Sequence, residues 1–185
     1  MSVKYIIKPA LTLFLIAAIV IAALSVVHTL TLEPIETQKR NTREAAMREV
    51  LPQASGYREI PAEISGSITA VYKGENGGDL RGYVLQCSPE GYSGSIDILV
   101  GISAVDEKIT GMRVLRHSET PGLGALAVKE DFYRRYDGKP LEPLGVARTS
   151  PGENEIQAIT SATITSKAVT GAVNEAIEWY KGGRK

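Results

Sequence analysis

The sequence predicts an α+β protein with one N-terminal transmembrane helix and one following domain, in which helices pack on an antiparallel sheet. Three observations predict this class: an uninterrupted apolar run near the N-terminus, a series of short strand-like segments separated by turn residues, and a last segment with helical periodicity. The chain has 185 residues, enough for one domain with a small appendage. We expect an anchor at residues 1–32, a linker helix at 33–54 and the domain at 55–185.

The apolar run is long enough to cross a membrane. No charged residue occurs between Lys8 and Glu33, and Leu11–Val27 is almost wholly apolar. A spanning helix needs roughly 20 apolar residues. A secretory signal has a shorter apolar stretch and a small-residue cleavage site, whereas this run ends in the unsuitable sequence HTLTLEP. The sequence therefore predicts a retained single-pass anchor, with a cleaved signal or a buried core helix as alternatives.

The charges that flank the run predict its orientation. Lys4 and Lys8 precede it without a neighbouring acid, while Glu33 and Glu36 follow it. More basic residues come later on that second side: Lys39, Arg40 and Arg43. The basic residues nearest the run favour a cytoplasmic N-terminus. We expect the chain in the cell membrane, in contact with lipid, with its domain on the extracytoplasmic side.

The next segments predict a polar helix and then a meander of four strands. The helix covers about residues 33–51. Turn signals separate the expected strands, the clearest being Asn76-Gly77-Gly78-Asp79, a hairpin sequence. The expected strands are Ser67–Glu75, Leu80–Ser88, Ser95–Ala104 and Lys108–His117.

The C-terminal third predicts helices around a loop. Ala125–Tyr136 has helical composition, and residues 139–155 are rich in Pro and Gly. In Ser166–Lys181 the apolar residues recur at helical spacing, so this helix should pack on the sheet. They are Val169, Val173, Ile177 and Tyr180.

Composition argues against several functions. Twenty-one basic residues balance 21 acidic ones, which disfavours nucleic acid as a partner. One cysteine and two histidines make a metal site or a disulfide framework improbable. Gly122–Ala127 imitates a dinucleotide-binding loop but follows Pro121 outside any βαβ unit. Gly91–Ser95 lacks the full sequence of a hydrolase nucleophile elbow. Cys87 is expected in the core, with a reactive thiol as the alternative.

A cluster of hydroxyl residues stands directly before the last helix. It lies within Ala158–Ser166 and comprises Thr160, Ser161, Thr163, Thr165 and Ser166. Ser and Thr cap helix N-termini, which would explain one or two of these hydroxyls. A helix N-terminus with free amides also attracts anions, and small hydroxylated residues would let a phosphate come close. Both interpretations, a helix cap and a phosphate site, stay open on these residues alone.

This cluster resembles the covalent-flavin attachment motif in the FMN-binding subunits of Rnf and Na⁺-pumping NADH:quinone oxidoreductase complexes. The motif runs Asp-x-x-Ser/Thr-Gly-Ala-Thr, and its last Thr carries FMN through a phosphoester. The match is Gln157–Thr163, so the resemblance implies covalent FMN on Thr163, with Thr165 as the neighbouring alternative. Gln157 stands where the family usually has Asp, and Ser161 where it usually has Gly. Serine replaces glycine easily unless the position needs a positive φ.

The resemblance implies further binding residues. His117–Gly124 (HSETPGLG) is similar to a signature loop of the family, and Gly91–Ile102 to its central strand region. In the loop, Pro121-Gly122 fits a type II turn, and Gly124 allows close backbone approach. The residues implied at the flavin from this loop are Glu119, Thr120, Gly122 and Leu123. Those implied at its phosphate are Thr160, Ser161, Ala162 and Thr165.

The implied role is electron relay. The chain is expected to be an FMN-carrying member of an Rnf-type ferredoxin:NAD⁺ oxidoreductase complex that transports Na⁺ or H⁺, with membrane and redox subunits as partners. No base in the motif activates Thr163, so attachment should need a flavin transferase using FAD. The alternatives are the NADH:quinone oxidoreductase, a stand-alone extracytoplasmic flavin relay, and a non-redox assembly or sensor module. The length is closest to that of the G subunits of Rnf complexes.

Overall fold

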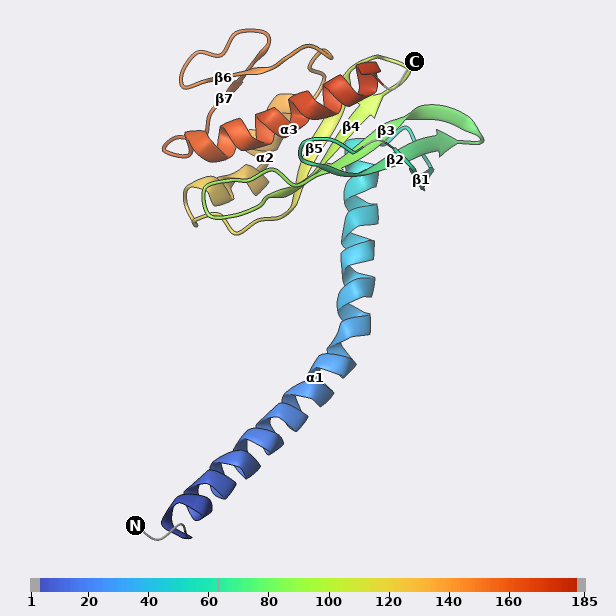
Figure 1. Ribbon diagram of the computed structural model, residues 1–185. Helices are drawn as coiled ribbons and strands as arrows, with labels where there is room; N and C mark the ends of the chain where they lie inside the picture. The colour runs from blue at the N-terminus through green and yellow to red at the C-terminus, as the bar shows by residue number, and fades with distance from the viewer. Residues whose placement is uncertain (1–3, 63, 183–185) are drawn as a thin grey trace. The chain divides into compact units, whose positions relative to one another are not determined.

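A computed structural model describes residues 4–62 and 64–182 and divides the chain into two compact units, Met1–Thr42 and Arg43–Lys185. Figure 1 shows the elements. The helices are α1 (Lys4–Val50), α2 (Glu130–Tyr133) and α3 (Thr163–Gly182), with short 3₁₀ helices η1 (Gly124–Val128) and η2 (Arg134–Tyr136). The strands are β1 (Gly56–Ile60), β2 (Ile68–Asn76), β3 (Asp79–Cys87), β4 (Asp97–Ser103), β5 (Ile109–Arg116), β6 (Gly145–Ala147) and β7 (Glu155–Gln157).

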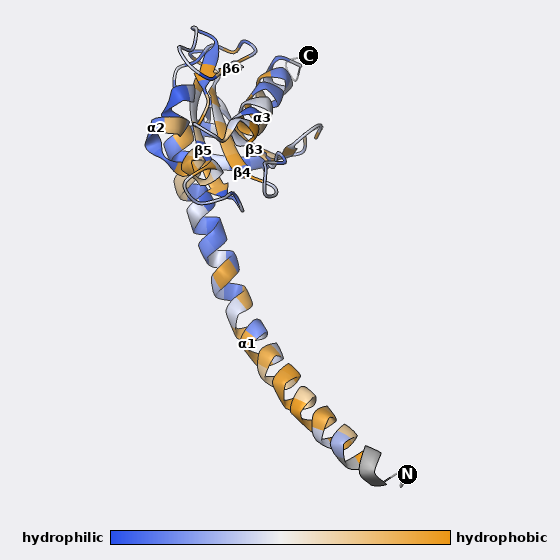
Figure 2. Cartoon of the chain, turned by 90° about the vertical axis from the view of Figure 1, so that its left-hand side faces the viewer, coloured by the Kyte–Doolittle hydropathy of each residue, from blue (hydrophilic) through white to orange (hydrophobic). Residues whose placement is uncertain are grey.

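The first unit holds most of α1, including its apolar part. Among the described residues, α1 is the one helix that is long and apolar enough to cross a membrane, with a mean hydropathy of 2.9 in its most apolar window. None of that window is buried against the rest of the protein. Figure 2 shows it as a continuous hydrophobic stretch. The helix continues through Pro34, although a proline lacks the amide that would complete the hydrogen-bond ladder.

The second unit is built on a five-stranded antiparallel sheet with the order β1-β2-β3-β4-β5. The expected meander is therefore present, with β1 as an additional edge strand. The hairpin between β2 and β3 closes where Asn76 pairs with Asp79. Gly77 and Gly78 in this turn have φ of 63° and 93°, as a type I′ turn requires.

Both faces of the sheet are covered, so its central strand is almost wholly buried. In β4, Ile98 and Val100 point toward α3 and join the larger apolar core, whereas Leu99 joins a smaller core on the opposite face. Met47 and Val50 of α1 belong to that smaller core. This alternation follows from the two-residue repeat of a strand.

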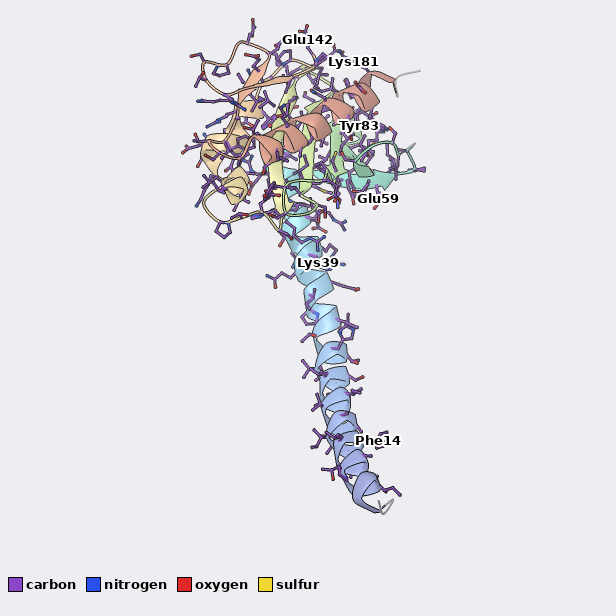
Figure 3. All side chains as sticks on the ribbon, turned by 60° about the vertical axis from the view of Figure 1, so that its left-hand side comes forward. Phe14, Lys39, Glu59, Tyr83, Glu142 and Lys181 are labelled. Atoms are coloured by element: carbon purple, nitrogen blue, oxygen red, sulfur yellow. The ribbon has the colours of Figure 1, made fainter. Side chains whose placement is uncertain are left out.

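Helix α3 crosses the sheet, as Figure 1 shows, and buries Val169, Val173 and Ile177 against it. Near its C-terminal end, the Tyr83 ring of β3 meets the Trp179 ring edge-on at a centroid distance of 5.5 Å. Figure 3 shows Tyr83 beside this part of the helix. The helix is thereby fixed along its length, which also fixes the position of its N-terminus.

Three local expectations differ from the structure. The residues expected as one helix at Ala125–Tyr136 form η1, α2 and η2 in succession. The expected loop at 139–155 contains β6 and leads into β7, which pair in parallel. Helix α3 begins at Thr163, three residues before the expected Ser166. The second compact unit begins at Arg43, because the last turns of α1 bury side chains against the sheet.

Cys87 lies in the core. Its side chain is fully buried, and burial raises the pKa of its thiol to about 12. Thiolate is the reactive form, so this cysteine is inert near neutral pH. The expectation of a core cysteine is met, and the alternative of a reactive thiol has no support here.

Candidate functional site

Four loops of the second unit enclose a cavity of about 730 Å³, within the range of small-molecule and cofactor sites. Its lining includes Tyr92 from the loop before β4, part of the loop after β5, and Arg148 and Thr149 after β6. Residues 158–165, which run into the first turn of α3, complete it. The hydroxyl cluster and the HSETPGLG loop, distant in sequence, therefore meet in one cavity.

The N-terminus of α3 opens into this cavity without a side-chain cap. Its first backbone hydrogen bond runs from the Ser166 amide to the Ala162 carbonyl at 3.1 Å. Within the described residues, the amides of Thr163, Ile164 and Thr165 have no acceptor. Such free amides, together with the positive end of the helix dipole, favour an anion. The helix-cap interpretation of the cluster receives no support from these contacts.

The hydroxyls of the cluster differ in what they contact. Ser166 is buried, donates to the Ala162 carbonyl at 3.0 Å and accepts from the Ile159 amide at 2.9 Å. Thr165 is also buried and donates to Glu119 at 2.7 Å. Thr160 and Ser161 are exposed, and Thr163 is half-buried. In the described chain, the hydroxyl of Thr163 has no hydrogen-bond partner. Thr163 lines the cavity, and within the described residues its hydroxyl is the free one of the helix's first turn.

Ser161 has the left-handed backbone conformation that favours glycine. Its φ is 63°, and it stands directly before Ala162 at the entrance to the helix. A non-glycine residue here carries backbone strain of order 1 kcal/mol or more. The position therefore does need a positive φ, and serine meets that requirement at an energetic cost.

Glu119 is a buried carboxylate at the back of the cavity, with only 5% of its surface exposed. Its Oε1 accepts the Tyr92 and Ser93 amides at 2.8 and 3.0 Å, and its Oε2 accepts the Thr165 hydroxyl. Burial alone would raise the pKa of this carboxyl. The hydrogen bonds from Ser93, Thr165 and Tyr92 outweigh burial, so its pKa lies below the ordinary value.

The remaining residues of the HSETPGLG loop have different positions. The Leu123 amide donates to the Thr120 carbonyl at 3.1 Å, and Gly122 has φ of 78°, which makes the expected type II turn. Thr120 and Leu123 line the cavity, whereas Gly122 does not. Gly124 does permit a close approach, but to the Glu119 and Thr165 side chains. The Nδ1 of His117 accepts the Glu119 amide at 3.2 Å.

Sequence reasoning missed several residues of this cavity. Arg148 and Thr149 line it because the Ala158 amide bonds the Ala147 carbonyl at 2.7 Å, which brings the end of β6 beside the hydroxyl cluster. Tyr92, Ile159 and Ile164 also line it. Gln157, the departing first residue of the motif, ends β7 outside the cavity wall, where its carbonyl accepts Arg135. The parallel pairing of such short strands gives no recognisable sequence signal.

The fold and the cavity define a membrane-anchored protein with a small cofactor-binding domain, and comparisons with known proteins specify the cofactor. Residues 91–178 match the FMN-binding domain family, and residues 1–50 match the RnfG N-terminal region. The domain is similar to the C subunit of the Na⁺-translocating NADH-quinone reductase from Parabacteroides distasonis, whose crystal structure superposes with a TM-score of 0.60 at 17% identity. That likeness covers 80% of this chain and 94% of the other, and confirms the fold class.

Two relatives in particular specify the family. The G subunit of the Na⁺-translocating ferredoxin:NAD⁺ oxidoreductase complex of Acetobacterium woodii is 38% identical, over 96% of this chain and 93% of its own. The G subunit of the ion-translocating oxidoreductase complex of Methanosarcina acetivorans is 34% identical, over 95% of each. The chain belongs to the RnfG family of G subunits, which confirms the family resemblance found in the sequence.

Proposed function

We propose that this chain is a membrane-anchored electron-transfer subunit of an ion-translocating ferredoxin:NAD⁺ oxidoreductase complex, with FMN held covalently on Thr163. The FMN-binding domain match and the names of the related G subunits support the cofactor and the complex. One observation carries the attachment site. Within the described chain, Thr163 is the one cavity-lining residue in the first turn of α3 whose hydroxyl has no protein partner.

The residues around Thr163 fit a phosphate. The free amides of the first turn of α3 and the hydroxyls of Thr160 and Ser161 supply donors. Arg148 supplies a positive charge, and its guanidinium forms no ion pair within the described residues. An anionic ester on Thr163 would thus be neutralised by the helix dipole and one arginine.

The rest of the cavity fits a flat aromatic ring. Tyr92, Leu123 and Ile164 line it, and each is substantially exposed, at 71%, 40% and 56%. Apolar side chains left in water at a cavity rim lose that exposure when a ring lies against them. FMN, when bound, would supply the redox chemistry, while these side chains hold the ring and exclude water from its faces.

The ionisable residues of the cavity lining favour electron relay over turnover of a small substrate. The cavity lining holds one carboxylate, Glu119, and both of its oxygens already accept hydrogen bonds from the protein. The described lining contains no histidine or lysine. A general base within reach of a substrate is therefore missing from it. Electrons would pass between the flavin and redox centres in neighbouring subunits.

The proposed location is the cell membrane. Helix α1 would span the bilayer once, with a cytoplasmic N-terminus and the FMN domain on the extracytoplasmic side. A covalent link between FMN and the protein would be useful on the extracytoplasmic side, because unattached flavin would diffuse away from the cell there. Maturation would require a flavin transferase that uses FAD, because the described residues near Thr163 include no free base.

The test of this role is purification of the full chain from its own membranes in mild detergent. The proposal predicts that it comes with other membrane and redox subunits and that the assembly reduces NAD⁺ with reduced ferredoxin. A Thr163→Ala chain should assemble equally but lose electron transfer. A flavinylated chain that purifies alone and supports no ferredoxin-dependent reaction would contradict the assignment to this complex.

A further inference from the structure

The Glu119 carboxylate, only 5% exposed, connects three segments of the site. One oxygen holds the turn at Tyr92 and Ser93 through two backbone amides, and the other holds the hydroxyl of Thr165 in α3, 46 residues away in sequence. Within the described chain no Lys or Arg pairs with it. A buried carboxylate without an ion-pair partner depends on all of its hydrogen bonds, because the loss of any donor leaves a buried charge less satisfied.

Two glycines give this carboxylate its space. A Cβ on Gly91 would lie 2.3 Å from Glu119 Oε1, and one on Gly124 would lie 2.1 Å from Oε2. The Gly124 Cβ would also lie 2.5 Å from the Thr165 hydroxyl oxygen. Any side chain at either position would force the carboxylate out of place. The contact among the Tyr92 turn, the loop after β5 and α3 is therefore close and specific.

The same contact separates the two threonines that could accept flavin. Thr165 is 1% exposed and its hydroxyl is bonded to Glu119. Successive helical residues are rotated by about 100°, so Thr163, two positions earlier, faces a different direction. It lines the cavity with its hydroxyl free among the described residues. Fixing Thr165 thus fixes the rotation of the turn that presents Thr163.

We propose that Glu119 is a positioning residue for flavin attachment: it anchors the first turn of α3 through Thr165, so that Thr163 presents the free hydroxyl of that turn. This rests on the proposed function. In the step concerned, the Thr163 oxygen forms an ester bond to the FMN phosphorus of FAD. The FAD pyrophosphate bond breaks, AMP leaves, and a base of the transferase takes the hydroxyl proton. Glu119 touches none of the reacting atoms.

The experiment measures FMN addition to the purified full chain by intact mass, with a flavin transferase and FAD, followed by peptide mapping. Thr165→Val removes the donor to Glu119 at nearly constant volume, and Thr165→Ser restores it. We expect Thr165→Val to lower kcat for addition at Thr163 roughly tenfold or more, and Thr165→Ser to stay near wild type. Glu119→Ala should slow addition similarly and place part of the FMN on Thr165. Glu90→Gln, an exposed carboxylate before the same turn, is the matched control.

A second readout needs no flavin. Amide hydrogen exchange at Tyr92 and Ser93 should accelerate in Glu119→Ala and stay unchanged in Glu90→Gln. Wild-type kcat and exclusive attachment at Thr163 in both Thr165→Val and Glu119→Ala would overturn the positioning role alone. A wild-type chain that gains no FMN would overturn the proposed function as well, so the two failures are distinguishable.

Discussion

Ser161 combines an unfavourable backbone conformation with a place in the cavity wall. Its φ of 63° stores strain directly before the helix that carries Thr163. Strain of this kind persists only where surrounding structure fixes the chain. Here the buried Ala162 and Thr165 on the same turn fix it. In the proposed function the serine hydroxyl would compensate for this strain, because it would add a phosphate donor that glycine lacks.

Ser161→Gly should therefore stabilise the protein. Relief of the left-handed conformation, less the entropy that glycine loses on folding, predicts a rise of about 0.5–1 kcal/mol in the free energy of unfolding. Thr160→Gly is the control: Thr160 is not among the residues with positive φ, so its replacement should lower stability. Urea unfolding of the full chains in detergent measures both. A Ser161→Gly chain no more stable than wild type would show that the position is unstrained.

The Glu119 carboxylate predicts a pH-dependent stability. Its pKa in the folded protein lies below the ordinary value of 4.5, because the donated hydrogen bonds outweigh burial. Its contribution is therefore complete above the unfolded pKa and is lost as pH falls through the folded pKa. The stability difference between wild type and Glu119→Gln should be largest near pH 7 and shrink below about pH 4.5. Denaturant titrations at pH 7, 5 and 3.5 measure it, and a difference that grows on acidification would refute the assignment.

At this scale the sequence predicted the residue types of the site but not their contacts. Thr163, Thr165 and Glu119 were all expected beside the flavin. The structure separates a free hydroxyl from one bonded to a buried carboxylate, and that distinction arises from segments 46 residues apart. The φ of Ser161 was likewise invisible, since serine gives no signal for a left-handed conformation. The roles of these residues at the cofactor stay predictions.

Among the elements, the C-terminal end of α1 contacts the sheet through glycines on neighbouring strands. A Cβ on Gly101 of β4 would lie 2.1 Å from the Val50 carbonyl oxygen, and one on Gly111 of β5 would lie 3.2 Å from the Val50 Cα. The Thr110 hydroxyl donates to the same Val50 carbonyl. The absence of side chains at these positions lets the helix end approach the strands, and the Thr110 hydroxyl satisfies one of its free carbonyls.

Gly101→Ala should disrupt this contact. The added methyl would overlap backbone that cannot rotate away, so we expect a loss of about 1–3 kcal/mol in the free energy of unfolding. Gly171→Ala is the matched control: Gly171 lies inside α3 with nothing within 4 Å of its Cβ position. That change should raise stability by about 0.5–1 kcal/mol. Thermal unfolding of the two variants compares them, and equal behaviour would contradict the close approach.

Elements with strong periodicity were predictable, and short ones were not. The hairpin at Asn76–Asp79 and helix α3 have clear local signals. The edge strand β1 and the pair β6–β7 are short and depend on tertiary pairing. The expected helix at 125–136 breaks into η1, α2 and η2, because the chain must bury Ala127, Phe132 and Tyr136 in one core.

For the whole molecule, the chain joins a helix long and apolar enough to cross a membrane to an FMN-binding domain of the RnfG family. The anchor was predictable because lipid demands a long apolar run, and the fold class because strands and turns alternate regularly. The cavity was predictable only through resemblance. Four loops far apart in sequence make it, and Arg148 and Tyr92 carry no motif of their own. The central claim is that FMN is attached at Thr163.

Intact mass of the full chain, made together with a flavin transferase, tests this claim most directly. The account predicts an increase equal to one FMN in wild type and in Thr165→Ser, and none in Thr163→Ala. The Thr163 hydroxyl is the free one in the first turn of α3 within the described chain, whereas Thr165 is bonded to Glu119. An FMN mass that survives Thr163→Ala, or that never appears in wild type, would contradict the account.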